Sequence, residues 1–261
     1  MTPADKHTKA FTAAFDSLRG MRSRWEVWQD FIQIVAIEIS SVTDKVNAPE
    51  RAKIYQGIVT KYSKKERETI ARMLAAVIAG VDENPDQDFL GMQYMLCELS
   101  SGHTGQFFTP YNISHMLAEL SFDEKMTEEK YGFTTINEPS CGAGANLIAF
   151  ANACKRRGIC YHDRVLFIAQ DLDYIVGLTC YIQLSLLGCA GYVVIGDTLA
   201  APALSRDEQG LLPAGPQNRI WYTPLFSSDV WIARRKIAEV KEAEKLLWET
   251  KPWPNGCKTG S

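Results

Sequence analysis

The 261-residue chain has no long apolar run and no excess of positive charge. No hydrophobic stretch approaches the ~20 residues that a membrane-spanning helix needs, and residues 1–10 are polar, unlike a secretory signal peptide. With a net charge of −3, the chain lacks a global basic field for nucleic acid, although a single groove can still be basic. These absences predict a protein without membrane segments that binds DNA only weakly by itself.

The seven cysteines are odd in number and match no common metal-binding pattern. Most lie in apolar segments, which is typical of reduced, buried thiols in a cytosolic protein. One grouping has the chemistry of a zinc site, namely Cys154, Cys160 and His162, but its spacing is unusual and it lacks a fourth ligand. The sequence therefore predicts a cytoplasmic location and no metal site.

Apolar side chains recur at helical spacing through the first 100 residues. Over residues 11–40 the steps between them are mostly three or four, which predicts one long amphipathic helix. Further helices are expected at 50–62, after Ser63, where a capping box begins, and at 88–99. The sequence thus predicts an all-helical N-terminal domain at residues 1–100. Its apolar faces are expected to pack together, with a partner-binding face as the alternative.

Beyond residue 101 short strands and helices alternate. Strands are expected at 133–136, 164–173, 191–199 and 218–222, and helices at 110–120, 145–156, 174–188 and 228–249. This alternation predicts an α/β fold with a short, parallel, doubly wound sheet, in which ligands bind at the carboxyl ends of the strands. We assign this domain to residues 101–235, and a C-terminal helix and tail to 236–261.

The segment NEPSCGAGANL, residues 137–147, is a glycine turn between the first strand and its helix. Gly142 and Gly144 are spaced as in G-x-G, but Leu147 stands where a dinucleotide motif has its third glycine. Glu138 beside a diphosphate would cost Coulomb energy. The turn therefore disfavours NAD and favours a ligand that carries positive charge.

Two further acids follow the next strands. Asp171 ends the second strand, where a carboxylate can accept both hydroxyls of a ribose. Asp197 ends the third, where it can accept from an exocyclic amine. Together with the turn, these residues predict a nucleoside ligand with a cationic appendage, such as S-adenosylmethionine.

Four motifs, taken in order, resemble the N6-adenine DNA methylases, and most of all the modification subunit of type I restriction systems. They are GQFFTP at 105–110, EPSCGAG at 138–144, QDLD at 170–173 and GDTL at 196–199. The resemblance covers residues 85–200 well and the first 85 loosely. It implies a Rossmann-like methyltransferase domain, S-adenosylmethionine as cofactor, and DNA as substrate, reached through a partner specificity protein.

The resemblance also implies which residues bind the cofactor. They are Phe108, Thr109 and Pro110 beside the methionine part, Glu138, Pro139, Gly142 and Gly144 in the glycine loop, Asp171 and Leu172 at the ribose, and Asp197 and Thr198 at the adenine amine. Structural roles are the alternative: Phe108 in the core, Pro139 as a turn former, and Asp173 as a helix N-cap.

The family's catalytic tetrad, Asn-Pro-Pro-Phe or Asn-Pro-Pro-Tyr after the fourth strand, is absent. In the family its polar groups accept from the adenine amine and its ring stacks on the flipped base. The nearest equivalent is Thr223-Pro224-Leu225-Phe226, which keeps one proline and the ring. We assign Thr223, Pro224 and Phe226 as candidate catalytic residues, with a strand end and a core phenylalanine as the alternative.

Two functions are compatible with these motifs. One is an S-adenosylmethionine-binding, N6-adenine DNA methyltransferase-like protein of low or no activity alone. The other is a non-catalytic binding or regulatory partner in a restriction–modification or mobile-element system. Methylation of another nitrogen, in RNA or protein, is a weaker third. Only 35 residues follow Phe226, so target recognition is expected from a partner. The basic cluster 234–236 is a candidate phosphate contact or a solvated helix face.

Overall fold

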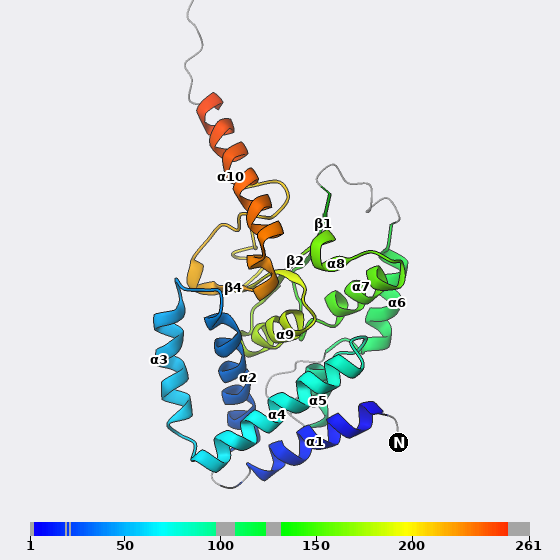
Figure 1. Ribbon diagram of the computed structural model, residues 1–261, viewed down its shortest axis with the longest axis vertical. Helices are drawn as coiled ribbons and strands as arrows, with labels where there is room; N and C mark the ends of the chain where they lie inside the picture. Colours follow the sequence, from blue (N-terminus) through cyan, green and yellow to red (C-terminus); the bar gives the residue numbers. More distant parts are fainter. Residues whose placement is uncertain (1–2, 19, 21, 98–107, 124–131, 250–261) are drawn as a thin grey trace, which may run out of the picture.

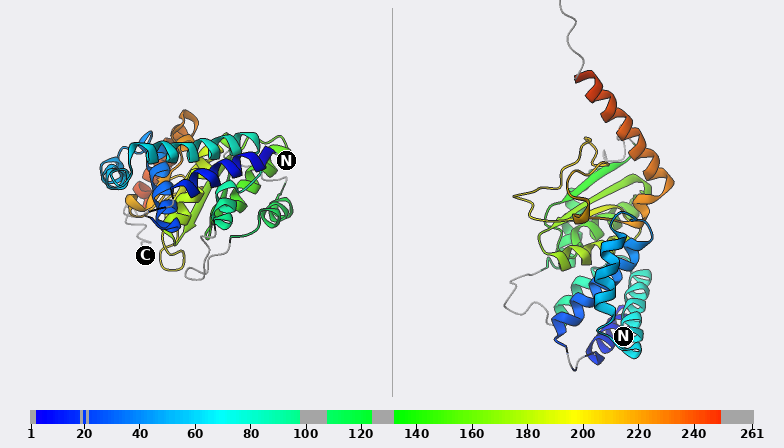
Figure 2. Two further views of the ribbon diagram at one scale, coloured as in Figure 1. Left: turned by 90° about the horizontal axis from the view of Figure 1, so that it is seen from below. Right: turned by 90° about the vertical axis from the view of Figure 1, so that its left-hand side faces the viewer.

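The computed structural model describes residues 3–18, 20, 22–97, 108–123 and 132–249. Helices from the first hundred residues form one end of the molecule, and a small sheet with its own helices forms the rest (Figure 1). The last helix starts beside the sheet and its C-terminal part projects away from the rest of the molecule (Figure 2). Within the described residues, no helix has the length and apolar character needed to cross a membrane.

The described residues of the N-terminal part form five helices. They are α1 (Pro3–Ser17), α2 (Arg24–Ser41), α3 (Ala48–Val59), α4 (Lys64–Glu83) and α5 (Phe89–Leu96). The prediction of one helix over 11–40 was wrong, because the chain breaks between Ser17 and Arg24. Gly20 lies in the break, and Ser23 caps α2 by accepting from Glu26 N at 3.1 Å. The predicted capping box of Ser63 and Glu66 is confirmed at the start of α4.

The apolar faces of these helices pack against one another, as predicted. Phe11 lies within 5.5–6.3 Å, centroid to centroid, of the rings of Phe15, Trp28, Phe31 and Phe89. All five rings are buried. Aromatic pairs at these separations add to the stabilisation that burial alone provides.

A four-stranded sheet follows, in the order β1 (Thr134–Glu138), β2 (Val165–Asp171), β3 (Ala190–Ile195) and β4 (Ile220–Tyr222). Strands β1, β2 and β3 are parallel, as predicted. Strand β4 runs antiparallel to β3, which corrects the prediction of an all-parallel sheet. The helices of this part are α6 (Tyr111–Ser121), α7 (Ala145–Arg156), α8 (Tyr161–Arg164) and α9 (Tyr174–Leu186), with the short helices η2 (Gln217–Arg219) and η3 (Pro224–Ser227).

The connection between β3 and β4 explains the reversed direction of β4. Residues 196–219 leave the carboxyl end of β3 and fold down over the sheet, where Tyr192 Oη donates to Gly210 O at 2.9 Å and Thr135 Oγ1 donates to Gln209 O at 2.6 Å. They return to the same edge before β4 begins. Parallel pairing would have required a crossover to the opposite edge.

The sheet has two differently covered faces. Along β2, Val165, Phe167 and Ala169 face the core formed with α7, α9 and α2, whereas Leu166 and Ile168 face the loop and α10 (Asp229–Glu249). On that second face Phe226 and Trp231 are fully buried. The predicted division at 235/236 falls inside α10.

The apolar residues of α6 and the basic cluster of α10 are placed differently from what their sequence pattern suggests. On α6, Ser114 and Ala118 are buried, while Ile113, Met116, Leu117 and Leu120 are exposed. In the basic cluster on α10, the guanidinium of Arg235 lies 4.5 Å from the centroid of Phe226 and that of Arg234 lies 4.5 Å from Trp231. These two arginines therefore cover core rings, while Lys236 is exposed.

Candidate functional site

The carboxyl ends of β1, β2 and β3 meet at one edge of the sheet. Glu138 pairs with Ala169, and Asp171 pairs with Ile195. The glycine turn follows β1, and Asp197 comes two residues after β3. The structure thus brings the turn, Glu138, Asp171 and the start of the 196–203 loop to the same edge, which we call the carboxyl edge.

The glycine turn requires both of its glycines. Gly142 and Gly144 have φ values of +54° and +100°, which L-residues with side chains rarely adopt. A Cβ on Gly144 would lie 3.0 Å from Cys180 Sγ, and one on Gly142 would lie 3.4 Å from the ring of Phe108. Cys141 N donates to Gln170 O at 2.9 Å and so attaches the turn to β2. The positive φ values therefore favour glycine at both positions, and at Gly144 a side chain would also press against Cys180.

Asp171 closes the turn from the second strand. Its Oδ2 accepts from Gly142 N at 2.9 Å, and its Oδ1 accepts from Asp173 N at 2.9 Å. Burial raises the pKa of this carboxyl, and the hydrogen bonds from Asp173 N and Gly142 N oppose the rise. The side chain is half-buried, so it supports the turn and still reaches the surface at the edge.

Glu138 lies at the other side of the turn. Its Oε2 accepts from Asn146 Nδ2 at 3.0 Å, and its Oε1 accepts from Ser140 N at 3.3 Å. Within the described part of the chain, no lysine or arginine forms an ion pair with Glu138 or Asp171. Although Arg219 Nη1 lies 3.9 Å from the position of a Cβ on Gly196, the edge carries two carboxylates with no ion-pair partner among the described residues. Such an edge repels a phosphate and attracts a sulfonium or ammonium group, so these residues fit S-adenosylmethionine.

The loop after β3 provides the third wall of the edge. Asp197 is exposed, and its Oδ1 accepts from Leu199 N at 2.8 Å. Thr198 Oγ1 donates to Pro139 O at 2.5 Å, which joins this loop to the glycine turn. Both predicted residues therefore lie at the edge, where Asp197 also shapes the loop that carries it.

Gln170 holds this loop in place and is not among the predicted site residues. It is buried, its Nε2 donates to Gly196 O at 3.1 Å and Ala201 O at 2.9 Å, and its Oε1 accepts from Ala203 N at 2.7 Å. The available signal was a polar side chain near the end of an otherwise apolar strand, VLFIAQD.

The remaining predicted cofactor residues lie around the same turn. The Phe108 ring is half-buried, lies 3.4 Å from the position of a Cβ on Gly142 and 4.9 Å from the ring of Tyr94, so it borders the turn and also joins the core. Thr109, Pro110, Pro139 and Leu172 are exposed. Residues 105–107 of the first motif lie outside the described residues. Asp173 caps α9 by accepting from Ile175 N and Val176 N, which confirms the N-cap alternative.

The candidate catalytic loop lies at the opposite end of the sheet. Thr223 is fully buried beside Gly191, the second residue of β3; its Oγ1 accepts from Gly191 N at 3.0 Å and donates to Gly191 O at 3.1 Å. Four residue steps of β3, from Gly191 to Ile195, separate this point from the carboxyl end of the strand, which is about 13 Å at about 3.3 Å per residue. The structure therefore does not bring Thr223 to the carboxyl edge.

Phe226 and Pro224 belong to the same loop and are likewise remote from the edge. The Phe226 ring is fully buried at 5.9 Å from both Tyr192 and Tyr222 and 6.2 Å from Trp231. Pro224 begins the short helix η3. A ring enclosed in this way cannot stack on a flipped base, so the geometry favours the alternative of a strand end with a core phenylalanine.

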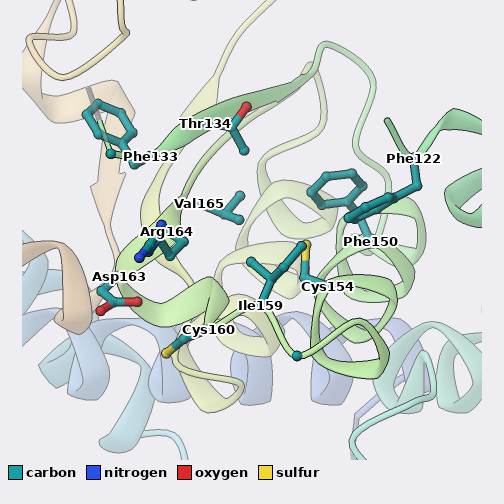
Figure 3. Close-up of a pocket in the computed structure, with 12 residues that line it drawn as sticks. Phe122, Phe133, Thr134, Phe150, Cys154, Ile159, Cys160, Asp163, Arg164 and Val165 are labelled. Atoms are coloured by element: carbon teal, nitrogen blue, oxygen red, sulfur yellow. The ribbon is translucent and has the colours of Figure 1, made fainter. Parts of the chain in front are cut away.

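A cavity of about 340 Å³ lies at the amino ends of β1 and β2 (Figure 3). Phe122, Phe133 and Phe150 line it, together with Cys154 and Cys160. None of the predicted cofactor residues reaches it. Burial raises the pKa of the Cys154 thiol to about 11, which disfavours the thiolate that a metal would need. Among the described residues, no three His, Cys, Asp or Glu side chains are grouped closely enough to bind a metal ion.

The profile of the N-6 DNA Methylase family matches residues 86–252. The chain belongs to this family. Membership confirms the family predicted from the four motifs and implies S-adenosylmethionine as the cofactor. A search of curated proteins finds no match.

Two solved structures are similar to the chain. One is a candidate class I S-adenosylmethionine-dependent methyltransferase from Listeria monocytogenes, at 16% identity and a TM-score of 0.42, covering 77% of this chain and 56% of that one. The other is a type I restriction–modification methyltransferase subunit from Streptococcus thermophilus, at 17% identity and a TM-score of 0.41, covering 76% of this chain and 44% of that one. The chain thus spans about half the length of these proteins. At such values the likeness carries no argument about activity.

Proposed function

We propose that the chain binds S-adenosylmethionine at the carboxyl edge and serves as a cofactor-binding protein of an N6-adenine DNA methylation system, with little or no methyl transfer by itself. The observation that supports this most directly is the pair of carboxylates, Glu138 and Asp171, on either side of a turn whose positive φ values favour glycine at 142 and 144. That charge would repel an anionic ligand.

Each residue at the edge has a distinct part in this proposal. Asp171 accepts from the ribose hydroxyls, and Asp197 from the adenine amine. Glu138 faces the cationic part of the ligand, and Gly142 and Gly144 let the backbone approach it. The remaining residues of the proposed cofactor site line its surface; they are Phe108, Thr109, Pro110, Pro139, Leu172 and Thr198. When bound, S-adenosylmethionine supplies an electrophilic methyl group.

The low activity expected of the chain alone follows from the position of Thr223 and Phe226. Both are buried at the amino end of β3, so neither can accept a hydrogen bond from, or stack on, a base at the carboxyl edge. Transfer to adenine would require acceptor groups from elsewhere, and we propose that a partner protein supplies them with DNA recognition. The same burial supports the second candidate function, a cofactor-binding regulatory module that never catalyses.

Calorimetric titration with S-adenosylmethionine tests the proposal. We expect micromolar binding by the wild-type chain and loss of binding in Asp171→Ala. Asp163→Asn is the matched control, because Asp163 is an exposed acid at the other end of the sheet. No binding by the wild-type chain, or equal binding by all three proteins, would contradict the proposal. Labelled methyl transfer to DNA, with and without a partner specificity protein, then separates the two candidate functions.

A further inference from the structure

Gln183 is a buried amide near the end of α9, between the glycine turn and the N-terminal helices. Its side chain is 1% exposed. Nε2 donates to Asp88 Oδ1 at 2.7 Å and to Ala143 O at 2.8 Å, and Oε1 accepts from Leu90 N at 3.0 Å. A flipped amide would place its oxygen against two acceptors and its hydrogens against a donor. Only one orientation of this side chain therefore satisfies its surroundings.

The contacts with Asp88 and Leu90 fix the start of α5. Asp88 is buried and caps that helix by accepting from Gly91 N at 2.9 Å, while Leu90 is its second residue. A Cβ on Gly91 would lie 2.0 Å from Asp88 Oδ2, so the cap closes tightly over the helix end. Through Asp88 and Leu90, Gln183 sets where α5 meets α9.

The contact with Ala143 fixes the glycine turn. Ala143 O accepts from Gln183, and the N–H of the same peptide unit, Gly144 N, donates to Cys141 O at 2.8 Å. These two bonds hold the plane of the Ala143–Gly144 peptide. That plane determines the left-handed conformation of Gly144 and hence the shape of the turn.

We propose that Gln183 is a positioning residue that holds the glycine turn in its ligand-accepting conformation and couples the turn to α5. The inference rests on the proposed binding of S-adenosylmethionine at this turn. When the competent fraction of a site falls, its apparent dissociation constant rises in proportion. Because one amide fixes both elements, ligand at the turn stabilises α5, and a firmly packed α5 favours the ligand.

Two isosteric variants separate this role from plain structural support. Gln183→Met removes all three hydrogen bonds. Asn152→Leu is the matched control: Asn152 is also buried, and its Nδ2 donates to Pro85 O and Ile148 O, both at 2.9 Å. It thus links the same N-terminal region to α7 without touching the turn. Hydrogen exchange, thermal unfolding and cofactor titration are measured on the full chain for both variants and the wild type.

Both variants are expected to lower the unfolding midpoint. Only Gln183→Met is expected to weaken S-adenosylmethionine binding, by about tenfold, as for loss of one buried hydrogen bond. Only it should speed amide exchange at residues 142–145 in the ligand-free protein. Added S-adenosylmethionine should slow exchange in α5 of the wild type and of Asn152→Leu, and not of Gln183→Met.

Wild-type affinity and wild-type exchange in the turn of Gln183→Met, with a lowered unfolding midpoint, would overturn the positioning role. If the wild-type chain itself fails to bind S-adenosylmethionine, the proposed function fails. Exchange at residues 142–145 of the ligand-free proteins then still decides whether Gln183 holds the turn.

Discussion

Thr223 provides a direct test of whether the Thr-Pro-Leu-Phe loop acts in the core or in catalysis. Thr223→Val keeps the shape of the side chain and removes its hydroxyl. Gly191 O retains a donor, Thr223 N at 3.0 Å, whereas Gly191 N loses the oxygen to which it donates. The substitution therefore leaves one buried donor unsatisfied.

The size of the effect follows from that single donor. An unsatisfied buried N–H costs about 1–3 kcal/mol. In a chain of this length each kcal/mol shifts the unfolding midpoint by about 2–4 °C, so we expect Thr223→Val to lower it by roughly 2–12 °C. Thr223→Ser keeps the hydroxyl and loses only a buried methyl, which costs about 1 kcal/mol.

Differential scanning calorimetry measures the midpoint, and isothermal titration measures affinity for S-adenosylmethionine on the same samples. We expect the affinity of Thr223→Val to equal that of the wild type, because Thr223 lies beside Gly191, and about 13 Å of β3 separates Gly191 from the carboxyl end of the strand. An unchanged midpoint together with weaker binding, or with loss of partner-dependent methyl transfer, would refute the structural role assigned here.

Three further predictions concern the carboxyl edge. Gly144→Ala should abolish cofactor binding and lower the free energy of unfolding by more than Gly158→Ala, since both have positive φ but only Gly144 would bring a Cβ against Cys180; chemical denaturation and titration measure this. Gln170→Leu should speed amide exchange at residues 196–203 and cost about 1–3 kcal/mol, because three loop groups lose their partner. Burial raises the pKa of Asp171 in the folded protein above its value in the unfolded chain. The folded state therefore holds this proton more tightly, and the free energy of unfolding falls as the pH rises from the unfolded-state pKa through the folded-state pKa. Denaturation across that window should show this fall for the wild type and not for Asp171→Asn.

The parts of the fold that depend on local patterns were predictable. Helices α7 and α9 have sustained apolar periodicity between glycine-bearing turns, and the capping box at Ser63 is a signal contained within four residues. The break after Ser17 was missed because Leu18 and Trp25 continue the apolar spacing across it. A short break whose length is close to a whole number of helical turns leaves the apolar residues on either side at helical spacing. Periodicity alone therefore does not reveal such a break.

The parts that depend on distant packing were not predictable. The direction of β4 is decided by where residues 196–219 contact the sheet, and no local pattern encodes that path. Gln183 contacts residues 93 and 95 positions away in the chain, through Leu90 and Asp88. The carboxyl edge was predictable because parallel strands bring their carboxyl ends together whatever the details of packing.

The distance between the cofactor residues and the Thr-Pro-Leu-Phe loop is built into the core. To bring Thr223 to the carboxyl edge, the chain would have to break the pairing of β4 with β3 and both hydrogen bonds between the Thr223 hydroxyl and Gly191. It would also have to expose Phe226, which costs about 1.5–3 kcal/mol for the ring alone. A ligand repays such costs only through differential affinity for the rearranged state, and the edge already positions its acids without any rearrangement. Cofactor binding should therefore survive in variants that disable this loop, and it is the property from which a partner-dependent activity would have to be built.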